Sequence, residues 1–110
     1  MHKILAALGT FMTIACTPAW AGTQTGQVID LSIRASDGLI YFYMNGMVSG
    51  RPACAVKSPY WVLKDERSAT AEKQFALLLE ARKTGQVITV IGSDTCLRES
   101  NGEDVNYIRF

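Results

Sequence analysis

Residues 68–91 read SATAEKQFALLLEARKTGQVITVI, and this stretch changes from a helical to a strand pattern at Gly85. Before that glycine, apolar positions recur at the spacing of one helix face, with Glu and Lys on the other faces. The residues predicted to share this face are Ala71, Phe75, Leu78 and Leu79, together with the basic Arg82. Ser68 or Thr70 can cap the start, and Gly85 can take the left-handed conformation that commonly ends a helix. We therefore predict one helix, followed directly by a buried strand over residues 87–91.

Two strands are predicted upstream of this helix. Residues 28–34 (VIDLSIR) alternate between apolar and polar side chains, which is typical of a half-buried strand. Its buried face is expected to consist of Ile29, Leu31 and Ile33. The turn residues SDG at 36–38 separate it from residues 39–45 (LIYFYMN), which are rich in aromatic side chains. The two segments are predicted to form a hairpin.

The remaining apolar runs complete the predicted order of elements. A short third strand is expected over residues 52–56 (PACAV), and residues 60–63 (YWVL) are expected to be an apolar connector with Trp61 in the core. A polar loop over 93–104 leads to a final strand over 105–110. The order of three strands, one helix and two strands is that of an OB-fold, a five-stranded Greek-key barrel with its helix between strands 3 and 4.

The sequence TGQVI occurs twice, at residues 25–29 and 84–88. The second copy ends the predicted helix, whereas the first begins the first strand, and the flanking sequences have nothing in common. We therefore interpret the chain as free of an internal repeat.

Residues 1–21 (MHKILAALGTFMTIACTPAWA) have the pattern of a signal peptide. A basic residue precedes an apolar run, and the triplet Ala19-Trp20-Ala21 is the kind of site that a signal peptidase cuts. The apolar run is too short for a membrane-spanning helix, which needs about 20 residues. An exported or secreted protein beginning at Gly22 is therefore expected, with residues 22–110 as a single OB-fold domain. Lipoprotein processing at Cys16 stays open as an alternative.

Two of the three cysteines, Cys54 and Cys96, lie in the expected mature chain. In an oxidising compartment a single pair predicts a disulfide, which would help a small domain with a modest core. Two buried free thiols are the alternative interpretation.

Charge and histidine content exclude several classes of function. Without Lys3, ten basic residues are balanced by ten acidic ones, which argues against nucleic-acid binding through phosphate contacts. The one histidine, His2, leaves with the signal peptide, so that no His-based triad or zinc site is expected. The adjacent acids Asp65 and Glu66, and Glu103 and Asp104, are expected to be solvated loop residues. We therefore expect no enzyme, no cofactor, no metal and no catalytic residues.

Three segments in order, GQVIDLSIRASDGLIYFYMNG (26–46), PACAVKSPYW (52–61) and KTGQVITV (83–90), make the chain resemble the binding subunits of subtilase cytotoxin and typhoid toxin. That resemblance implies a secreted OB-fold protein that forms a homo-pentamer, binds sialylated glycans and partners an A-type toxin subunit. The family's sugar-contacting serine corresponds to Thr25 here, its acidic residue after the second strand to Asn45, and its aromatic residue near the helix end to Arg82. A family cysteine corresponds to Tyr43, which implies a different disulfide.

Two functional hypotheses follow. In the first, a carbohydrate-binding module uses Thr25 and Asn45 to hydrogen-bond a sugar, and Tyr41 or Tyr43 stacks on the sugar ring. Ordinary barrel packing is the alternative role for these tyrosines. In the second, the domain is a periplasmic protein-interaction or scaffold module without a sugar site.

Overall fold

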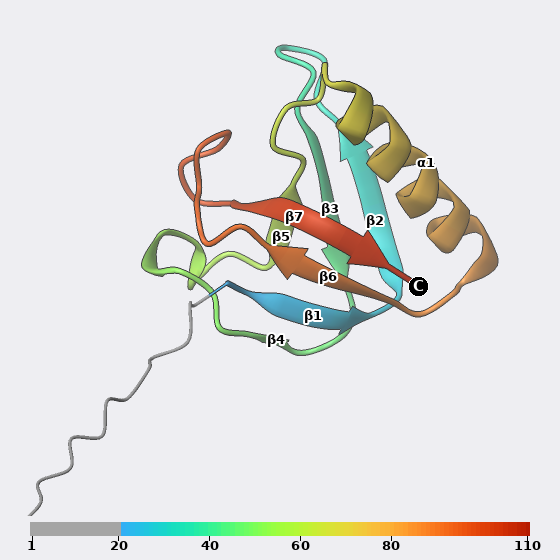
Figure 1. Cartoon of the computed structure of the whole chain (residues 1–110), viewed down its shortest axis with the longest axis horizontal. Coiled ribbons are helices and arrows are strands. Elements are labelled where there is room, and N and C mark those ends of the chain that lie inside the picture. Colours follow the sequence, from blue (N-terminus) through green and yellow to red (C-terminus); the bar gives the residue numbers. More distant parts are fainter. Residues whose placement is uncertain (1–20) are drawn as a thin grey trace, which may run out of the picture.

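Seven strands and one α-helix follow one another in the computed structural model, which describes residues 21–110 (Figure 1). The elements in order are β1 (Thr23–Gly26), β2 (Val28–Ile33), β3 (Ile40–Met44), β4 (Val48–Ser49), the short 3-10 helix η1 (Ala53–Ala55), β5 (Tyr60–Val62), α1 (Ala69–Thr84), β6 (Ile88–Gly92) and β7 (Glu103–Arg109). The expectation of a mainly β chain with one helix is confirmed. The number of strands is larger than the five expected.

The strands pair in the order β2-β3-β5-β7-β6-β1-β4, and β5 and β7 are the parallel pair. Only Gln27 separates β1 from β2, although β2 is at one end of the strand order and β1 is next to the other end. The register shifts between Val28 and Asp30, which places an irregularity at the start of β2. The additional strands are therefore β1, which continues into β2, and the two-residue β4.

The expected hairpin is present, because β2 and β3 pair antiparallel over Val28–Ile33 and Ile40–Met44. The expected burial of its first strand is wrong in part. Ile29 is 52% exposed and Ile33 is 59% exposed, whereas Val28 is buried. The irregularity next to Val28 interrupts the alternation that a regular strand would have given.

The expected third strand over residues 52–56 is wrong. Pro52 has a φ of −65° and precedes η1, and the strand lies instead at Tyr60–Val62, in the segment expected to be a connector. β5 pairs with both β3 and β7, so Trp61 points into the core and is fully buried, as expected. A short apolar run carries little periodicity, which is why the two segments could not be told apart.

Helix α1 begins and ends as predicted. Ser68 Oγ accepts a hydrogen bond from the Ala71 N–H at 3.0 Å, and Gly85 has a φ of 72°. The helix buries Ala71, Leu78 and Ala81, whereas Leu79, expected on the buried face, is 41% exposed, and Arg82 is also exposed. The buried face of α1 is therefore rotated about the helix axis relative to the predicted face.

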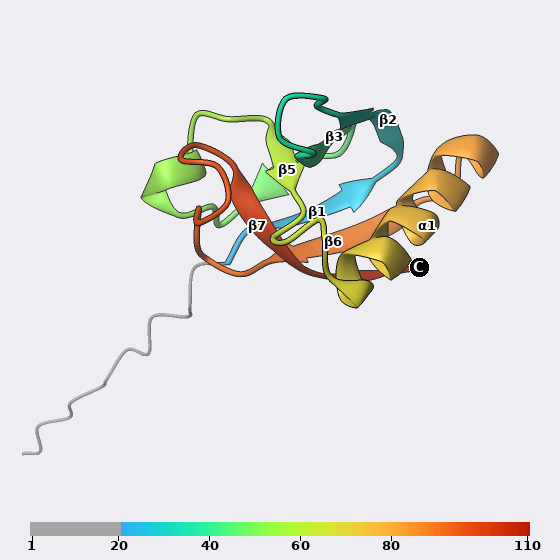
Figure 2. The same ribbon diagram turned by 90° about the horizontal axis from the view of Figure 1, so that it is seen from above.

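The disulfide between Cys54 and Cys96 is confirmed. It joins η1 to the loop after β6, and both views place these segments at the end of the molecule opposite α1 (Figures 1 and 2). The expected signal peptide and the alternative at Cys16 lie outside the described residues, apart from Ala21. Within residues 21–110, no helix has the length and apolar character needed to cross a membrane.

Candidate binding face

Three tyrosines meet on the outer face of β3 and β5. Tyr41 and Tyr43 alternate with the fully buried Phe42 and therefore point away from the core. Tyr60 stands opposite Tyr43 in the register. The ring centroids lie 5.8 Å apart for Tyr41 and Tyr60, 5.9 Å for Tyr43 and Tyr60, and 6.3 Å for Tyr41 and Tyr43. We call these three residues the tyrosine face, and each remains partly exposed.

Polar groups border the tyrosine face on two sides. On β2, Asp30 lies opposite Tyr43 and Ser32 lies opposite Tyr41. The Ser32 hydroxyl donates to Asp30 Oδ1 at 3.0 Å. On the other side, the Tyr60 hydroxyl donates to Asn101 Oδ1, in the loop between β6 and β7. The aromatic rings are thus next to hydroxyl, carboxylate and amide groups.

The position of Tyr60 is fixed by its neighbours. A side chain at Gly102 would come within 2.8 Å of the Tyr60 ring and 3.1 Å of Val62, so the loop backbone packs closely over β5. Burial raises the pKa of the Tyr60 phenol, and the nearby charge of Glu99 raises it further. The phenol is therefore neutral at physiological pH and can both donate and accept hydrogen bonds.

An ion-pair network lies beside this face. Arg34 Nη2 is 2.7 Å from Asp37 Oδ2 and 3.3 Å from Glu99 Oε1. The guanidinium holds the pKa of Asp37 well below its usual range, and Asp37 in turn raises the pKa of Arg34. Arg98 pairs with Glu66 at 2.8 Å. The network ties together the β2–β3 turn, the segment before α1 and the β6–β7 loop.

The residues Thr25 and Asn45 form a second group. Asn45 Oδ1 accepts a hydrogen bond from the Gln27 N–H at 2.7 Å, and its Nδ2 donates to Gln27 Oε1 at 3.1 Å. The hydroxyls of Thr25 and Thr89 are hydrogen-bonded at 2.9 Å. Gln27 and Arg82 also line an open hollow of about 200 Å³. Asn45 therefore braces the junction between β1 and β2.

The predicted site residues thus fall into two groups. Tyr41 and Tyr43 join Tyr60, while Thr25 and Asn45 lie at the β1–β2 junction; among the described residues no hydrogen bond or ring contact links one group to the other. Tyr60 was missed because its segment was interpreted as a connector. Its alternation with the buried Trp61 was the signal that could have identified it.

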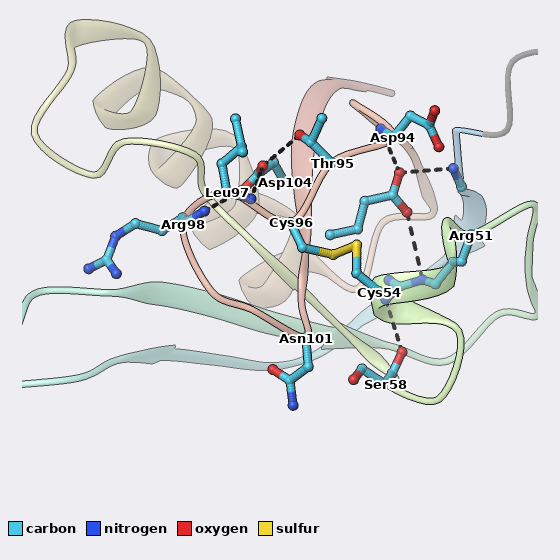
Figure 3. Close-up of a disulfide and its surroundings, with 12 residues drawn as sticks. Arg51, Cys54, Ser58, Asp94, Thr95, Cys96, Leu97, Arg98, Asn101 and Asp104 are labelled. Atoms are coloured by element: carbon cyan, nitrogen blue, oxygen red, sulfur yellow. Dashed lines mark hydrogen bonds and ion pairs between the residues drawn. A yellow bond between two sulfur atoms is a disulfide. The ribbon is translucent and has the colours of Figure 1, made fainter.

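Both acids at the start of β7 are fully buried, which corrects the expectation that they are solvated. Asp104 accepts hydrogen bonds from the Thr95 hydroxyl at 2.7 Å, from the Leu97 N–H at 2.8 Å and from the Arg98 N–H at 3.2 Å (Figure 3). The carboxylate holds the loop that also carries Cys96. Its role in this arrangement is to order the loop backbone.

Glu103 points to the opposite side of the strand, toward Trp61. The Trp61 indole donates to Gln24 Oε1 at 2.7 Å in the core, and the Arg51 guanidinium lies 4.2 Å from the Trp61 ring centroid. Arg51 Nη1 donates to two backbone carbonyl oxygens, those of Ser58 and Tyr60, each at 2.9 Å. A buried polar cluster thus occupies the disulfide end of the molecule.

Neither the acidic pair Asp65 and Glu66 nor a second hollow, between α1 and β7, provides a candidate catalytic site. Glu66 is committed to Arg98, and Asp65 accepts a hydrogen bond from the Arg67 N–H at 3.1 Å. A hollow of about 290 Å³ lies between the start of α1 and β7, and its lining includes Lys64, Gln74 and Asn106 but no aromatic residue. Within residues 21–110, no three His, Cys, Asp or Glu side chains gather as a metal site would require.

Comparison with known proteins found no protein-family model, no curated protein and no solved structure that matches this chain.

Proposed function

We propose that this chain is an exported, non-enzymatic carbohydrate-binding module built on an OB-fold. Support for the fold comes from the strand pairings. If β1 and β2 are counted as one interrupted strand, the pairings form a closed ring of five, namely β1/β2, β3, β5, β7 and β6, with α1 between the third and fourth in sequence. OB-folds bind oligosaccharides and oligonucleotides on the face of their second and third strands. Those strands are β3 and β5.

The observation that carries the proposal is the tyrosine face itself. Three partly exposed aromatic rings lie within 6.3 Å of one another on β3 and β5, beside Ser32 and Asn101. A sugar has an apolar face that an aromatic ring covers, and hydroxyls that match hydroxyl and amide groups. This combination is common in ligand sites, where apolar surface supplies contact and a few polar groups set orientation.

The charges around the tyrosine face favour the binding of a neutral sugar ring there. Arg34 is engaged with Asp37 and Glu99, so its charge is already compensated at the edge of the face. For the sialylated glycans that the toxin resemblance suggests, Arg82 at the hollow beside Gln27 is the cation available to a carboxylate. We therefore assign the ring stacking to the tyrosine face and keep Thr25 and Asn45 as a separate contact for an acidic sugar.

A glycan array of neutral and sialylated sugars, followed by calorimetry on each hit, tests the proposal. Tyr43→Ala and Tyr60→Ala are expected to weaken binding about tenfold or more, equivalent to ~1.4 kcal/mol, because each removes a stacking ring. Tyr107→Ala is the matched control, because Tyr107 is 46% exposed on β7 and outside the cluster. Loss of binding in Thr25→Ala with the tyrosine variants unaffected would move the site to the β1–β2 junction.

A silent array would overturn the glycan proposal. Recovery of a protein partner whose binding falls in Tyr60→Ala would then favour the protein-interaction module. The homo-pentamer and the A-type toxin subunit remain proposals from the resemblance. Light scattering of the purified protein tests the first, and co-purification with the product of a neighbouring toxin gene tests the second.

A further inference from the structure

The backbone nitrogen of Gly22 meets a buried carboxylate. Its N–H donates to Glu103 Oε2 at 3.0 Å, across 81 residues of sequence. Gly22 is buried, and Glu103 is fully buried. Gly22 is also the residue that follows the triplet Ala19-Trp20-Ala21, which has small residues at its first and last positions and where the sequence predicts cleavage. Two independent observations thus identify the same atom.

The Glu103 carboxylate is only partly satisfied. Its Oε2 also accepts the Asp94 N–H at 3.0 Å, whereas Oε1 has no hydrogen-bond partner among the described residues. The nearest cation is Arg51, whose Nε lies 4.0 Å from Oε1. Burial raises the pKa of Glu103, because the charged carboxylate has lost its water. A buried charge in this state calls for a closer cation with hydrogen atoms to donate.

The geometry around the carboxylate admits glycine alone at position 22. A side chain there would collide with Glu103 Oε1 and would come within 3.0 Å of Arg51 and 3.2 Å of Trp61. On the other side, a side chain at Gly92 would collide with Glu103 Oε2. The carboxylate is therefore enclosed between two glycine backbones: the nitrogen of Gly22 donates to Oε2, and Oε1 lies where a side chain at Gly22 would stand.

We propose that hydrolysis of the Ala21–Gly22 bond creates an α-ammonium group that forms a buried ion pair with Glu103. Water supplies a hydroxyl to the Ala21 carbonyl carbon and a proton to the Gly22 nitrogen, and a second proton from solvent completes the ammonium while the Ala21 carboxyl ionises. The nitrogen then has three N–H donors in place of one. One retains the bond to Oε2, and another serves Oε1.

The order of events follows from burial. Because Gly22 is enclosed in the folded chain, the bond is cut before folding, by an export-linked endopeptidase that reads the small residues Ala19 and Ala21. Folding then brings the new terminus to Glu103. Arg51 donates from Nη1 to two carbonyl oxygens and lies over the Trp61 ring, while its Nε faces Oε1 at 4.0 Å without a hydrogen bond, so Oε1 stays open to the new ammonium. Removal of the leader is thus linked to stability of the folded domain, whatever ligand the domain binds.

The first experiment determines the terminus. The full 110-residue chain is expressed in a host that exports it, and the purified protein is analysed by intact mass and N-terminal sequencing. A start at Gly22 is expected. A start at any other residue, or a retained leader, would overturn the proposal.

The second experiment measures whether the α-amine is paired. The exported protein is treated with limiting acylating reagent, and labelling is quantified by peptide mass spectrometry in buffer and in urea. The α-amine is expected to react at least about tenfold more slowly in the folded protein, since an ion pair raises its pKa by one unit or more. The exposed Lys57, Lys64, Lys73 and Lys83 are internal controls that should react alike in both states. Equal α-amine reactivity in the two states would refute the ion pair.

The variant Glu103→Gln distinguishes protection of the α-amine by the ion pair from protection by burial alone. It is expected to restore α-amine labelling, whereas Glu99→Gln, which changes an acid beside Arg34 in the loop before β7, should leave the protection unchanged. If Glu103→Gln fails to fold, the pH profile of labelling in the unmodified protein decides. Half-maximal labelling at least one pH unit above the ordinary α-amine value of about 7.7–8.0 supports the ion pair, and half-maximal labelling at that ordinary value refutes it.

Discussion

Removal of the Cys54–Cys96 bridge is expected to cost about 4 kcal/mol of unfolding free energy. The two cysteines are 42 residues apart. In the chain-entropy description, a cross-link over that length removes about 13 cal/mol/K from the unfolded ensemble, which is about 4 kcal/mol at 25 °C. The closed loop contains β5, α1 and β6, so the bridge restricts the segments that supply much of the core.

The packing contribution of the bridge is expected to be small. Cys54 is exposed and Cys96 is partly exposed, so little apolar surface returns to water when both are replaced. The Cα–Cα distance of 6.3 Å is also within the range that ordinary bridges span. The loss should therefore report mainly on the unfolded chain.

The test is urea unfolding of the double variant Cys54→Ala/Cys96→Ala beside the oxidised protein. The midpoint should fall, and the denaturant slope m should rise, because the unfolded chain without the bridge exposes more surface. In thermal unfolding, a loss of this size corresponds to about 16–30 °C for a domain of this length. Reduced and alkylated protein is the control and should agree with the double variant. A loss under about 1 kcal/mol with unchanged m would refute the entropic reasoning.

Three further predictions concern the core, the helix and pH. Trp61→Phe should cost about 2–4 kcal/mol in urea unfolding, because it removes indole contacts and leaves Gln24 Oε1 unsatisfied; a cost no larger than that of an exposed substitution would contradict this. Gly85→Ala should cost about 1 kcal/mol because its φ of 72° strains a Cβ, and Gly85→Asn, the control, should cost less; equal costs would contradict the conformational explanation. The Arg98 hydrogen bond lowers the pKa of Glu66, so this pair stabilises the fold above the unfolded pKa and the contribution is lost as pH falls through the folded value. Arg98→Gln should flatten the acid limb of the stability profile, and an unchanged limb would show that other carboxylates dominate.

Helix α1 could be predicted from the sequence because its signals are local. Ser68 accepts the hydrogen bond of the third helical N–H, and Gly85 takes the left-handed conformation, as their residue types favour. Which residues the helix buries depends on the surface that it packs against. That surface is formed by β2 and β7, so the exposure of Leu79 could not be predicted from α1 alone.

The third strand and the tyrosine face depend on contacts distant in sequence. Residues 52–56 and 60–62 are both short apolar runs, and pairing of β5 with β3 and β7 decides which one is the strand. The disulfide, in contrast, could be predicted from the residue count and the expected oxidising compartment. Tyr41 and Tyr43 were identified from an aromatic run, but Tyr60 joins them only through the antiparallel register with Tyr43.

Glu103 and Asp104, the adjacent acids at the start of β7, position backbone groups on both faces of the sheet. Successive side chains of a strand point to opposite faces, so Glu103 faces inward beside Trp61, while Asp104 is on the outward face beside Val62, where it is buried beneath the β6–β7 loop. The inward carboxylate holds the backbone of Gly22, and the outward one holds the loop that brings Asn101 to Tyr60. The two carboxylates are adjacent in the chain, so a displacement of β7 at this point alters both. We therefore expect the proposed N-terminal ion pair and the geometry of the tyrosine face to be coupled through β7, and the proposed sugar binding by the tyrosine face to weaken when the α-amine is blocked.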